Sequence, residues 1–305
     1  KDTKRAAGFS APPPFSLHTK GVPSMKLITC LYKGEERVGA LTEEGVAFLP
    51  YPDMNTLIES LPPAAFAVTS TAKPVPLEDV TLLAPIPRPR QDVICLGMNY
   101  RDHEKEAAKY DAEAFKKEKP AAVYFSKRVS QAGDPDGDIP RYEGLVERLD
   151  YEAELAVIIG KTARNVKAEN AGDYIFGYTV LNDVSARDLQ TGHKQWYFGK
   201  GLDGFTPMGP CILTADETAF PPALDISCAV NGEERQRSNT ALLIHGIPEI
   251  IEELSAGMTL LPGTIIATGT PAGVGMGSAP PKFLSAGDVV ACPIQNVGTL
   301  RSTVR

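Results

Sequence analysis

The 305-residue sequence lacks the features that mark several common classes of protein. No apolar run reaches the roughly 18 residues that a membrane-spanning helix needs, so we expect no membrane span. The five cysteines contain no C-x-x-C pair, which argues against a zinc ribbon and a disulfide scaffold. The presence of only four histidines limits any histidine-rich metal site. Acidic residues outnumber basic ones, 38 to 31, without a long basic run, so nucleic acid is not an expected partner.

Familiar catalytic motifs are missing as well. Without G-x-S-x-G a serine nucleophile elbow is unsupported, and without H-E-x-x-H a zincin metalloprotease is excluded. The glycine-rich segment 269–277 lacks G-K-[ST], and the prolines within and after it disfavour a following helix, so a P-loop or Rossmann motif is weakly supported. Two interpretations of this segment remain: a turn-rich loop, or a loop whose backbone N–H groups hold an anionic substrate.

The composition nevertheless supports a folded protein with a sizeable core. Hydrophobic residues make up 43% of the chain and charged residues 23%, which excludes global disorder. The cysteines are odd in number and scattered, as expected for reduced thiols in the cytosol. No signal-peptide pattern occurs in order, so secretion is not expected. We therefore predict a cytoplasmic protein.

The length predicts two domains at roughly 150 residues per domain, or one large domain with an appendage. Residues 1–24, which include three consecutive prolines, form a leader or extension before Met25. Short strands, turns and a helix at 54–60 then indicate a small α+β domain at 25–90. Alternating prolines at 85–89 favour an extended connector, because they block a helix and remove backbone donors. The larger domain is predicted at 91–305.

The larger domain is predicted to be rich in strands. Short apolar runs favour strands near 156–159, 178–181, 226–230, 264–268 and 289–293. Helices are expected at 102–119 and 247–255, the second opened by a proline. Because strands and helices do not alternate regularly, we predict an α+β protein with a mixed sheet.

Three carboxylates form the first candidate site. Glu152 and Glu154 stand at the head of an apolar strand and, two residues apart, project to the same side. Asp183 follows another predicted strand. Three converging carboxylates suit a hard divalent ion such as Mg²⁺ or Mn²⁺. The alternatives are a solvated strand edge for the two glutamates and a helix N-cap for Asp183.

A histidine and a glutamate form the second candidate site. His103 and Glu106 are three residues apart in a polar predicted helix and are therefore neighbours on one face. A carboxylate bonded to one ring nitrogen would orient the imidazole and leave the other nitrogen to accept a proton. The alternative is an exposed histidine on a solvated helix.

Together, and in this order, the motifs resemble the fumarylacetoacetate hydrolase superfamily, in particular its smaller members of the acylpyruvate hydrolase and 2-hydroxyhepta-2,4-diene-1,7-dioate isomerase type. The resemblance covers about residues 93–304. It is carried by the segments at 97–103 (GMNYRDH), 150–155 (DYEAEL), 176–190, 199–200, 207–210, 230–233, 258–260 and 268–275.

This resemblance implies a mixed β-sandwich roll that forms a homodimer. It implies Mg²⁺, or alternatively Mn²⁺ or Ca²⁺, bound by Glu152, Glu154 and Asp183, and it assigns His103 and Glu106 to the catalytic pair.

The resemblance also assigns residues around the substrate. Lys200 matches the family's active-site lysine, and Arg187, Gln190 and Thr270 match positions that touch the carboxylate or keto oxygens of the substrate. One departure concerns Lys127, which is followed by arginine where relatives often have proline. The role of Lys127 is therefore left open.

The implied substrate is a small 2-keto acid, with a metal-stabilised enolate as the shared chemistry. Because His103 and Glu106 are both present, we favour hydrolysis of a C–C bond in a 2,4-diketo acid of the acylpyruvate or fumarylacetoacetate type. The alternative is an isomerase, tautomerase or decarboxylase acting on 2-hydroxymuconate-type dienes or oxaloacetate at the same site. A non-catalytic module that binds dicarboxylates or metal is the third hypothesis.

Overall fold

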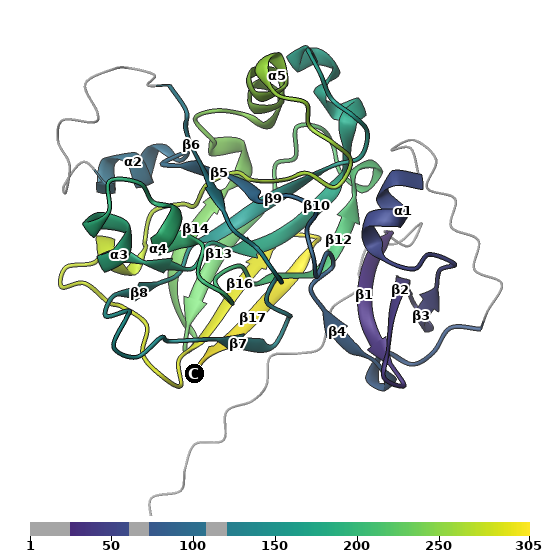
Figure 1. Cartoon of the computed structure of the whole chain (residues 1–305), viewed down its shortest axis with the longest axis horizontal. Helices are drawn as coiled ribbons and strands as arrows, with labels where there is room; N and C mark the ends of the chain where they lie inside the picture. Colours follow the sequence, from purple (N-terminus) through teal and green to yellow (C-terminus); the bar gives the residue numbers. More distant parts are fainter. Residues whose placement is uncertain (1–24, 61–72, 108–120) are drawn as a thin grey trace, which may run out of the picture.

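The computed structural model describes residues 25–60, 73–107 and 121–305 (Figure 1). The predicted extension at 1–24 and residues 108–119 of the predicted helix lie outside these ranges. Within them, no helix is both long enough and apolar enough to cross a membrane.

Strands dominate the described part of the chain. A ten-stranded sheet has the order β3-β2-β1-β12-β10-β9-β15-β5-β6, with β4 paired to β1. Its strands are β1 Lys26–Tyr32, β2 Glu35–Thr42, β3 Gly45–Phe48, β4 Thr81–Leu83, β5 Val93–Gly97, β6 Val123–Lys127, β9 Ala153–Ile159, β10 Ile175–Asn182, β12 Met208–Thr214 and β15 Ile265–Ala267. The β15–β5 pair is parallel and the other pairs are antiparallel, so the sheet is mixed as predicted.

A second sheet of five strands has the order β14-β13-β16-β17-β7. Its strands are β7 Gly137–Ile139, β13 Asp225–Val230, β14 Glu233–Asn239, β16 Val289–Ile294 and β17 Gly298–Val304, and a separate pair is formed by β8 Leu149–Asp150 and β11 Ser185–Ala186. The α-helices are α1 Met54–Ser60, α2 Arg101–Ala107, α3 Arg187–Gly192, α4 Tyr197–Lys200 and α5 Ile247–Gly257. Short 3-10 helices lie at η1 Leu77–Asp79, η2 Ala168–Tyr174, η3 Ala215–Glu217, η4 Thr240–Leu242 and η5 Gly275–Gly277.

Strand β9 lies between two hydrophobic cores, which explains why its sequence is almost continuously apolar. Leu155 and Val157 belong to the core shared with the five-stranded sheet, whereas Ala156 and Ile158 belong to the core that includes the buried side chains of α1. Since side chains alternate along a strand, β9 contributes to a core on each face of the large sheet. Every residue of β9 and β10 is buried.

The N-terminal strands continue the large sheet. Strand β1 pairs antiparallel with β12 through Lys26 opposite Leu213 and Leu27 opposite Ile212. The strands before residue 90 and the sheet that carries β9 are thus hydrogen-bonded into one layer. The division into domains at 25–90 and 91–305 stays a prediction, while the predicted α+β class with mixed, strand-rich sheets is confirmed.

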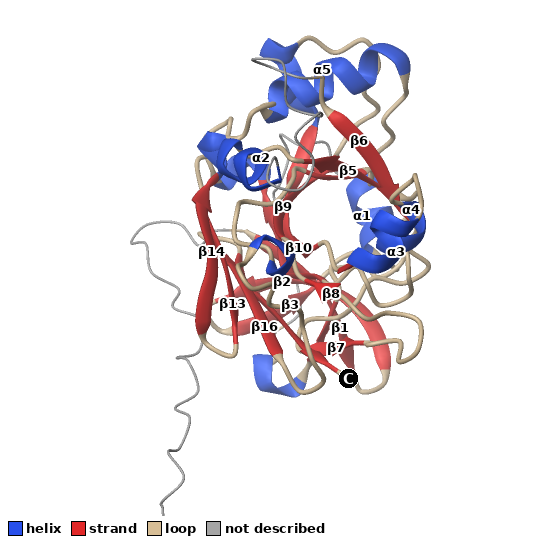
Figure 2. Ribbon diagram, turned by 90° about the vertical axis from the view of Figure 1, so that its left-hand side faces the viewer, coloured by secondary structure: helices blue, strands red, loops and turns tan. Residues whose placement is uncertain are grey.

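Helices α2, α3 and α4 gather at one end of the molecule, on the opposite side from α1 (Figure 1). In the view turned by 90°, α2 is separated from the α3–α4 pair, and β9 and β10 lie behind and between them (Figure 2). Helix α2 follows β5, α3 follows β11 and α4 follows α3, so the three helices carry side chains to the region where buried strands begin or end.

A substitution at Gly177 can test how tightly β10 packs on β12. A Cβ at Gly177 would lie 2.4 Å from the carbonyl oxygen of Leu213, so Gly177→Ala should force the strands apart. We expect it to lower the free energy of unfolding by about 1–3 kcal/mol in urea denaturation. Gly257→Ala is the matched control, because a Cβ there meets no described atom within 4 Å. Equal denaturation midpoints for the two variants would contradict this packing.

Candidate functional site

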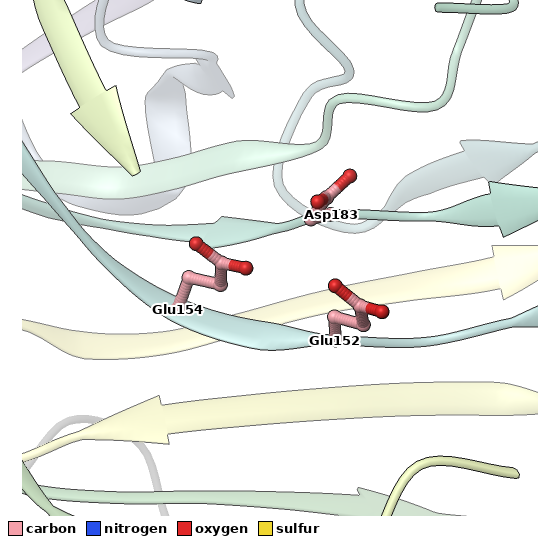
Figure 3. A group of neighbouring side chains, drawn as sticks. All are labelled: Glu152, Glu154 and Asp183. Carbon is pink, nitrogen blue, oxygen red and sulfur yellow. The ribbon is translucent and has the colours of Figure 1, made fainter. Parts of the chain in front are cut away.

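The structure brings Glu152, Glu154 and Asp183 together (Figure 3). One carboxylate oxygen from each lies within 4.8 Å of the others, and all three residues are buried. Glu154 belongs to β9, Glu152 immediately precedes that strand, and Asp183 immediately follows β10. Because β9 and β10 are antiparallel, the start of one lies beside the end of the other. Burial excludes the alternative of a solvated strand edge.

Glu154 shows that this cluster suits a cation. Its Oε2 accepts a hydrogen bond from the backbone N–H of Gly269 at 2.7 Å, whereas no donor among the described residues reaches its buried Oε1. Burial, followed by the charges of Asp183 and Glu152, raises the pKa of Glu154 well above its usual range. A divalent cation would remove both penalties, and a donor set of carboxylate oxygens fits Mg²⁺, Mn²⁺ or Ca²⁺.

Two cations on the short helices offset part of the negative charge. The Nζ of Lys200 at the end of α4 lies 2.9 Å from Glu152 Oε2 and 2.7 Å from Asp183 Oδ2. Arg187 at the start of α3 places Nη2 2.6 Å from Glu152 Oε1. Burial opposes ionisation of Glu152, but Lys200 and Arg187, with a smaller contribution from His103, hold its pKa at about 2.

Lys200 is a cation and hydrogen-bond donor rather than a base. Burial disfavours its charged form, but Asp183 and Glu152 outweigh burial and raise the pKa of Lys200 above its ordinary value. The predicted catalytic lysine therefore lies beside the triad, where Asp183 and Glu152 favour its charged form. Such an ammonium group can stabilise negative charge that develops on a substrate oxygen.

Two charged residues of the site were given no role from the sequence. Lys127, fully buried at the end of β6, places Nζ 2.5 Å from Asp183 Oδ1 and 3.1 Å from the carbonyl oxygen of Val184. Asp150, also fully buried, accepts a bond from Nε of Arg187 at 2.9 Å. The sequence shows Lys127 within a strand segment and Asp150 in the D-Y-E-x-E segment, and both could have been singled out as buried charges. It does not show that Lys127 pairs with Asp183 or Asp150 with Arg187.

The predicted substrate-contacting residues bond to the protein itself. Nη1 of Arg187 donates to Oε1 of Gln190 at 2.9 Å. The hydroxyl of Thr270 donates to the carbonyl oxygen of Ala153 at 3.0 Å and accepts from Nε2 of Gln236 at 2.8 Å. Arg187 reaches the triad through Glu152, whereas Thr270 supports the backbone at the start of β9. Substrate contact by Arg187, Gln190 and Thr270 stays a prediction.

Helix α2 carries the predicted histidine–glutamate pair. Nδ1 of His103 lies 3.0 Å from Oε2 of Glu106, and the side chain of each is 12% exposed. The alternative of a fully solvated histidine is therefore wrong. A proton on Nδ1 satisfies the bond to Glu106, which leaves Nε2 as the ring nitrogen that can accept a proton. His103 is also close enough to the triad to lower the pKa of Glu152.

The glycine-rich segment binds the protein's own carboxylates. Four of its backbone N–H groups donate to acidic side chains of the site over 2.7–3.2 Å. These bonds join Gly269 to Glu154, Gly273 to Glu106, and both Gly275 and Met276 to Asp150. The hypothesis that these amides hold an anionic substrate is wrong for these four groups, because their donors are already used.

The fold and the site define an enzyme built on mixed sheets, with a carboxylate triad and a histidine–glutamate pair. Residues 92–305 match the family described as fumarylacetoacetate (FAA) hydrolase, C-terminal, and the chain belongs to this family. Oxaloacetate tautomerase YisK of Bacillus subtilis (strain 168) is 47% identical over 229 residues, which cover 75% of this chain and 74% of that protein. The family resemblance found in the sequence is thereby confirmed.

Solved structures support the same assignment. Fumarylacetoacetate hydrolase (EaFAH) from the psychrophilic Exiguobacterium antarcticum is 39% identical, with a TM-score of 0.82 over 92% of this chain and 99% of that chain. The 5-carboxymethyl-2-hydroxymuconate delta-isomerase from Mycobacterium smegmatis is 33% identical, with a TM-score of 0.73 over 92% and 99%. Similar relatives therefore bear the names of a tautomerase, a hydrolase and an isomerase.

Glu154→Gln separates metal binding from folding. In the metal-free protein the pKa of Glu154 is raised, so the folded state disfavours the ionised carboxylate. The free energy of unfolding should therefore fall as the pH rises above the usual pKa range of a glutamate. The glutamine variant, which cannot ionise, should be more stable than the wild type at pH 8. The same change should weaken Mn²⁺ binding by about 100-fold or more, since even an outer-shell partner contributes about 10–100-fold.

Thermal unfolding with and without Mn²⁺, together with calorimetric titration, measures both effects. Glu252→Gln is the control, because Glu252 is a half-exposed acid of α5 that pairs with Lys167 and is not a member of the triad. Wild-type Mn²⁺ affinity in Glu154→Gln would exclude Glu154 as a ligand.

Proposed function

We propose that the protein is a divalent-metal-dependent enzyme that moves a proton on the carbon next to the keto group of a small 2-keto acid. Keto–enol tautomerisation of oxaloacetate is the leading reaction, and isomerisation of 2-hydroxymuconate-type dienes is the related one. The observation that carries the proposal is the His103–Glu106 pair together with a buried carboxylate triad to which Lys200 donates hydrogen bonds. The relatives named tautomerase and isomerase support this reaction better than the hydrolysis favoured by the sequence.

The triad supplies the cation site of this reaction. Mg²⁺, with Mn²⁺ or Ca²⁺ as alternatives, would be held by Glu152, Glu154 and Asp183, and it supplies Lewis-acid polarisation of the substrate's carboxylate and keto oxygens when bound. The unpartnered oxygen of Glu154 and the oxygen-only donor set support this choice of a hard cation.

The protein's side chains are proposed to transfer the proton, stabilise negative charge and orient the substrate. Glu106 holds Nδ1 of His103, so that Nε2 takes the proton from the substrate carbon and delivers it to the enolate oxygen, which forms the enol, or to another carbon in the diene isomerisation. Such help is typically worth about 10²–10⁴ in rate. The Lys200 ammonium stabilises the negative charge that moves to the keto oxygen. Arg187, Gln190 and Thr270 are proposed to orient the substrate carboxylate, with Lys127 and Asp150 holding Asp183 and Arg187 in place.

The proposal extends to the state of the protein. We propose a cytoplasmic homodimer that acts on a small-molecule 2-keto acid, without nucleic acid or membrane as a partner. The formal charge of −7 disfavours long-range attraction of an anionic substrate, so the local cations at the triad carry more of the binding. Light scattering measures the oligomeric state.

Hydrolysis of a C–C bond in a 2,4-diketo acid is the second candidate function. It is favoured by the TM-score of 0.82 to a structure named fumarylacetoacetate hydrolase. In that reaction His103 would take a proton from a water molecule that attacks the distal carbonyl carbon, and the pyruvate enolate would be the leaving group. The two candidates differ in whether a water is activated, which substrates can distinguish.

The test follows loss of the oxaloacetate enol by ultraviolet absorbance, and release of pyruvate from acylpyruvates and from oxaloacetate, each with Mg²⁺ and with a chelator. We expect metal-dependent tautomerisation, and a drop of about 10²–10⁴-fold in kcat for His103→Gln. His193→Gln, which changes an exposed histidine, is the control. Pyruvate release from acylpyruvates would favour the hydrolase, and pyruvate release from oxaloacetate would favour a decarboxylase. The absence of metal-dependent turnover on any of these substrates would contradict the proposal of an enzyme.

A further inference from the structure

Glu106 lies against Gly277 in a space that no other residue type would leave open. A Cβ at Gly277 would lie 2.0 Å from Oε1 of Glu106, 2.2 Å from its Cδ and 2.8 Å from its Cγ. The first two atoms belong to the carboxylate group and the third is the adjoining methylene carbon, so the whole end of the Glu106 side chain would have to move to relieve the overlap. The bare Cα of η5 is therefore part of the surface on which Glu106 rests.

The backbone does not itself require glycine at this position. Gly277 is absent from the described glycines with positive φ, so an alanine there would meet no conformational strain of that kind. Gly273 differs, because it has φ +104° and a Cβ would lie 1.9 Å from the carbonyl oxygen of Arg235. Glycine is thus required at position 277 by contact with Glu106, whereas at position 273 it is required by the positive φ and the nearby carbonyl oxygen of Arg235.

A hydrogen bond fixes Glu106 on the same turn. The backbone N–H of Gly273 donates to both carboxylate oxygens of Glu106, each at 3.2 Å. Two further amides of the turn, at Gly275 and Met276, donate to Asp150 at 2.7 and 2.9 Å. The turn at 273–276 therefore bonds both to Asp150, which anchors Arg187, and to Glu106, which orients the imidazole of His103.

Helix α2 alone would orient this imidazole weakly. Within its seven described residues, the pair of His103 and Glu106 is the contact that orients the ring. A pair at i and i+3 on an isolated helix gives only about a twofold preference. Contact with the turn supplies the additional constraint that a single imidazole orientation requires.

We propose that residues 273–277 form a seat for Glu106, and that Gly277 is a positioning residue that sets where His103 stands relative to the carboxylate triad. This inference rests on the proposed function insofar as His103 is the proton-transferring base. The seat itself, however, is a structural relationship that can be measured without substrate or metal.

The experiment compares the wild type with Gly277→Ala, Glu106→Ala and the double variant. Gly257→Ala is the matched control, since alanine there meets no described atom within 4 Å. Nitrogen-15 NMR of histidine-labelled, metal-free protein reports the tautomer of each histidine, and His103→Gln identifies the signal of His103. We expect the Nδ1–H tautomer in the wild type and the control, and its loss in Gly277→Ala and Glu106→Ala.

Kinetics with oxaloacetate give the second readout. Gly277→Ala should lower kcat by about 10²-fold with little change in KM, because it displaces the base without removing a substrate contact. The double variant should be no slower than Glu106→Ala, since the two changes disable the same contact. Multiplied effects in the double variant, or a retained Nδ1–H signal in Gly277→Ala, would overturn the proposal.

Folding supplies a further discriminating outcome. If Gly277→Ala does not fold, removal of the Glu106 side chain in the double variant should restore folding, which would show that the added methyl group collides with Glu106. Failure of both to fold would overturn the seat. If the wild type turns over no substrate, the proposed function fails, while the tautomer measurement still decides whether the seat exists.

Discussion

Mutual repulsion among three buried carboxylates is the constraint on which the rest of the site depends. The groups lie within 4.8 Å of one another, and their surroundings bring basic side chains from three elements: Lys127 from β6, Arg187 from α3 and Lys200 from α4. With Asp150 included and all groups ionised, four acids face three bases, which leaves a net charge of −1. A divalent cation reverses that sign, so the loaded site would attract the dianion of a dicarboxylic acid.

The glycine-rich segment joins the two functions of the site. The amide of Gly269 donates to Glu154 of the triad, and the amide of Gly273 donates to the acid that orients His103. The amides of Gly275 and Met276 donate to the acid that anchors Arg187. Because all of these donors belong to one stretch of backbone, this segment links the acid that orients His103 to a carboxylate that would hold the cation. Such a link favours proton transfer between fixed positions.

The sequence predicted those parts of the site that follow from short-range rules. Alternation along a strand placed Glu152 and Glu154 together, and helical spacing paired His103 with Glu106, while Asp183 came from a strand end and was supported by the family motifs. Partners distant in sequence were not predictable in this way. Lys127 and Asp183 are 56 positions apart, and the amides at 269–276 meet acids more than a hundred positions earlier, so only the folded sheets bring them into contact. The mixed-sheet class followed from composition and motifs, but the β1–β12 pairing, in which Lys26 lies opposite Leu213, did not.

That pairing bears on how the chain can be divided. Every residue of β12 is buried, and β1 provides its neighbour on the side away from β10. A fragment that began at residue 92 would leave part of an apolar strand with unpaired N–H and C=O groups, which is a template for joining another chain. Strand β1 therefore covers part of an edge of β12 that would otherwise be open to another chain, and this consequence is independent of any chemistry at the carboxylates.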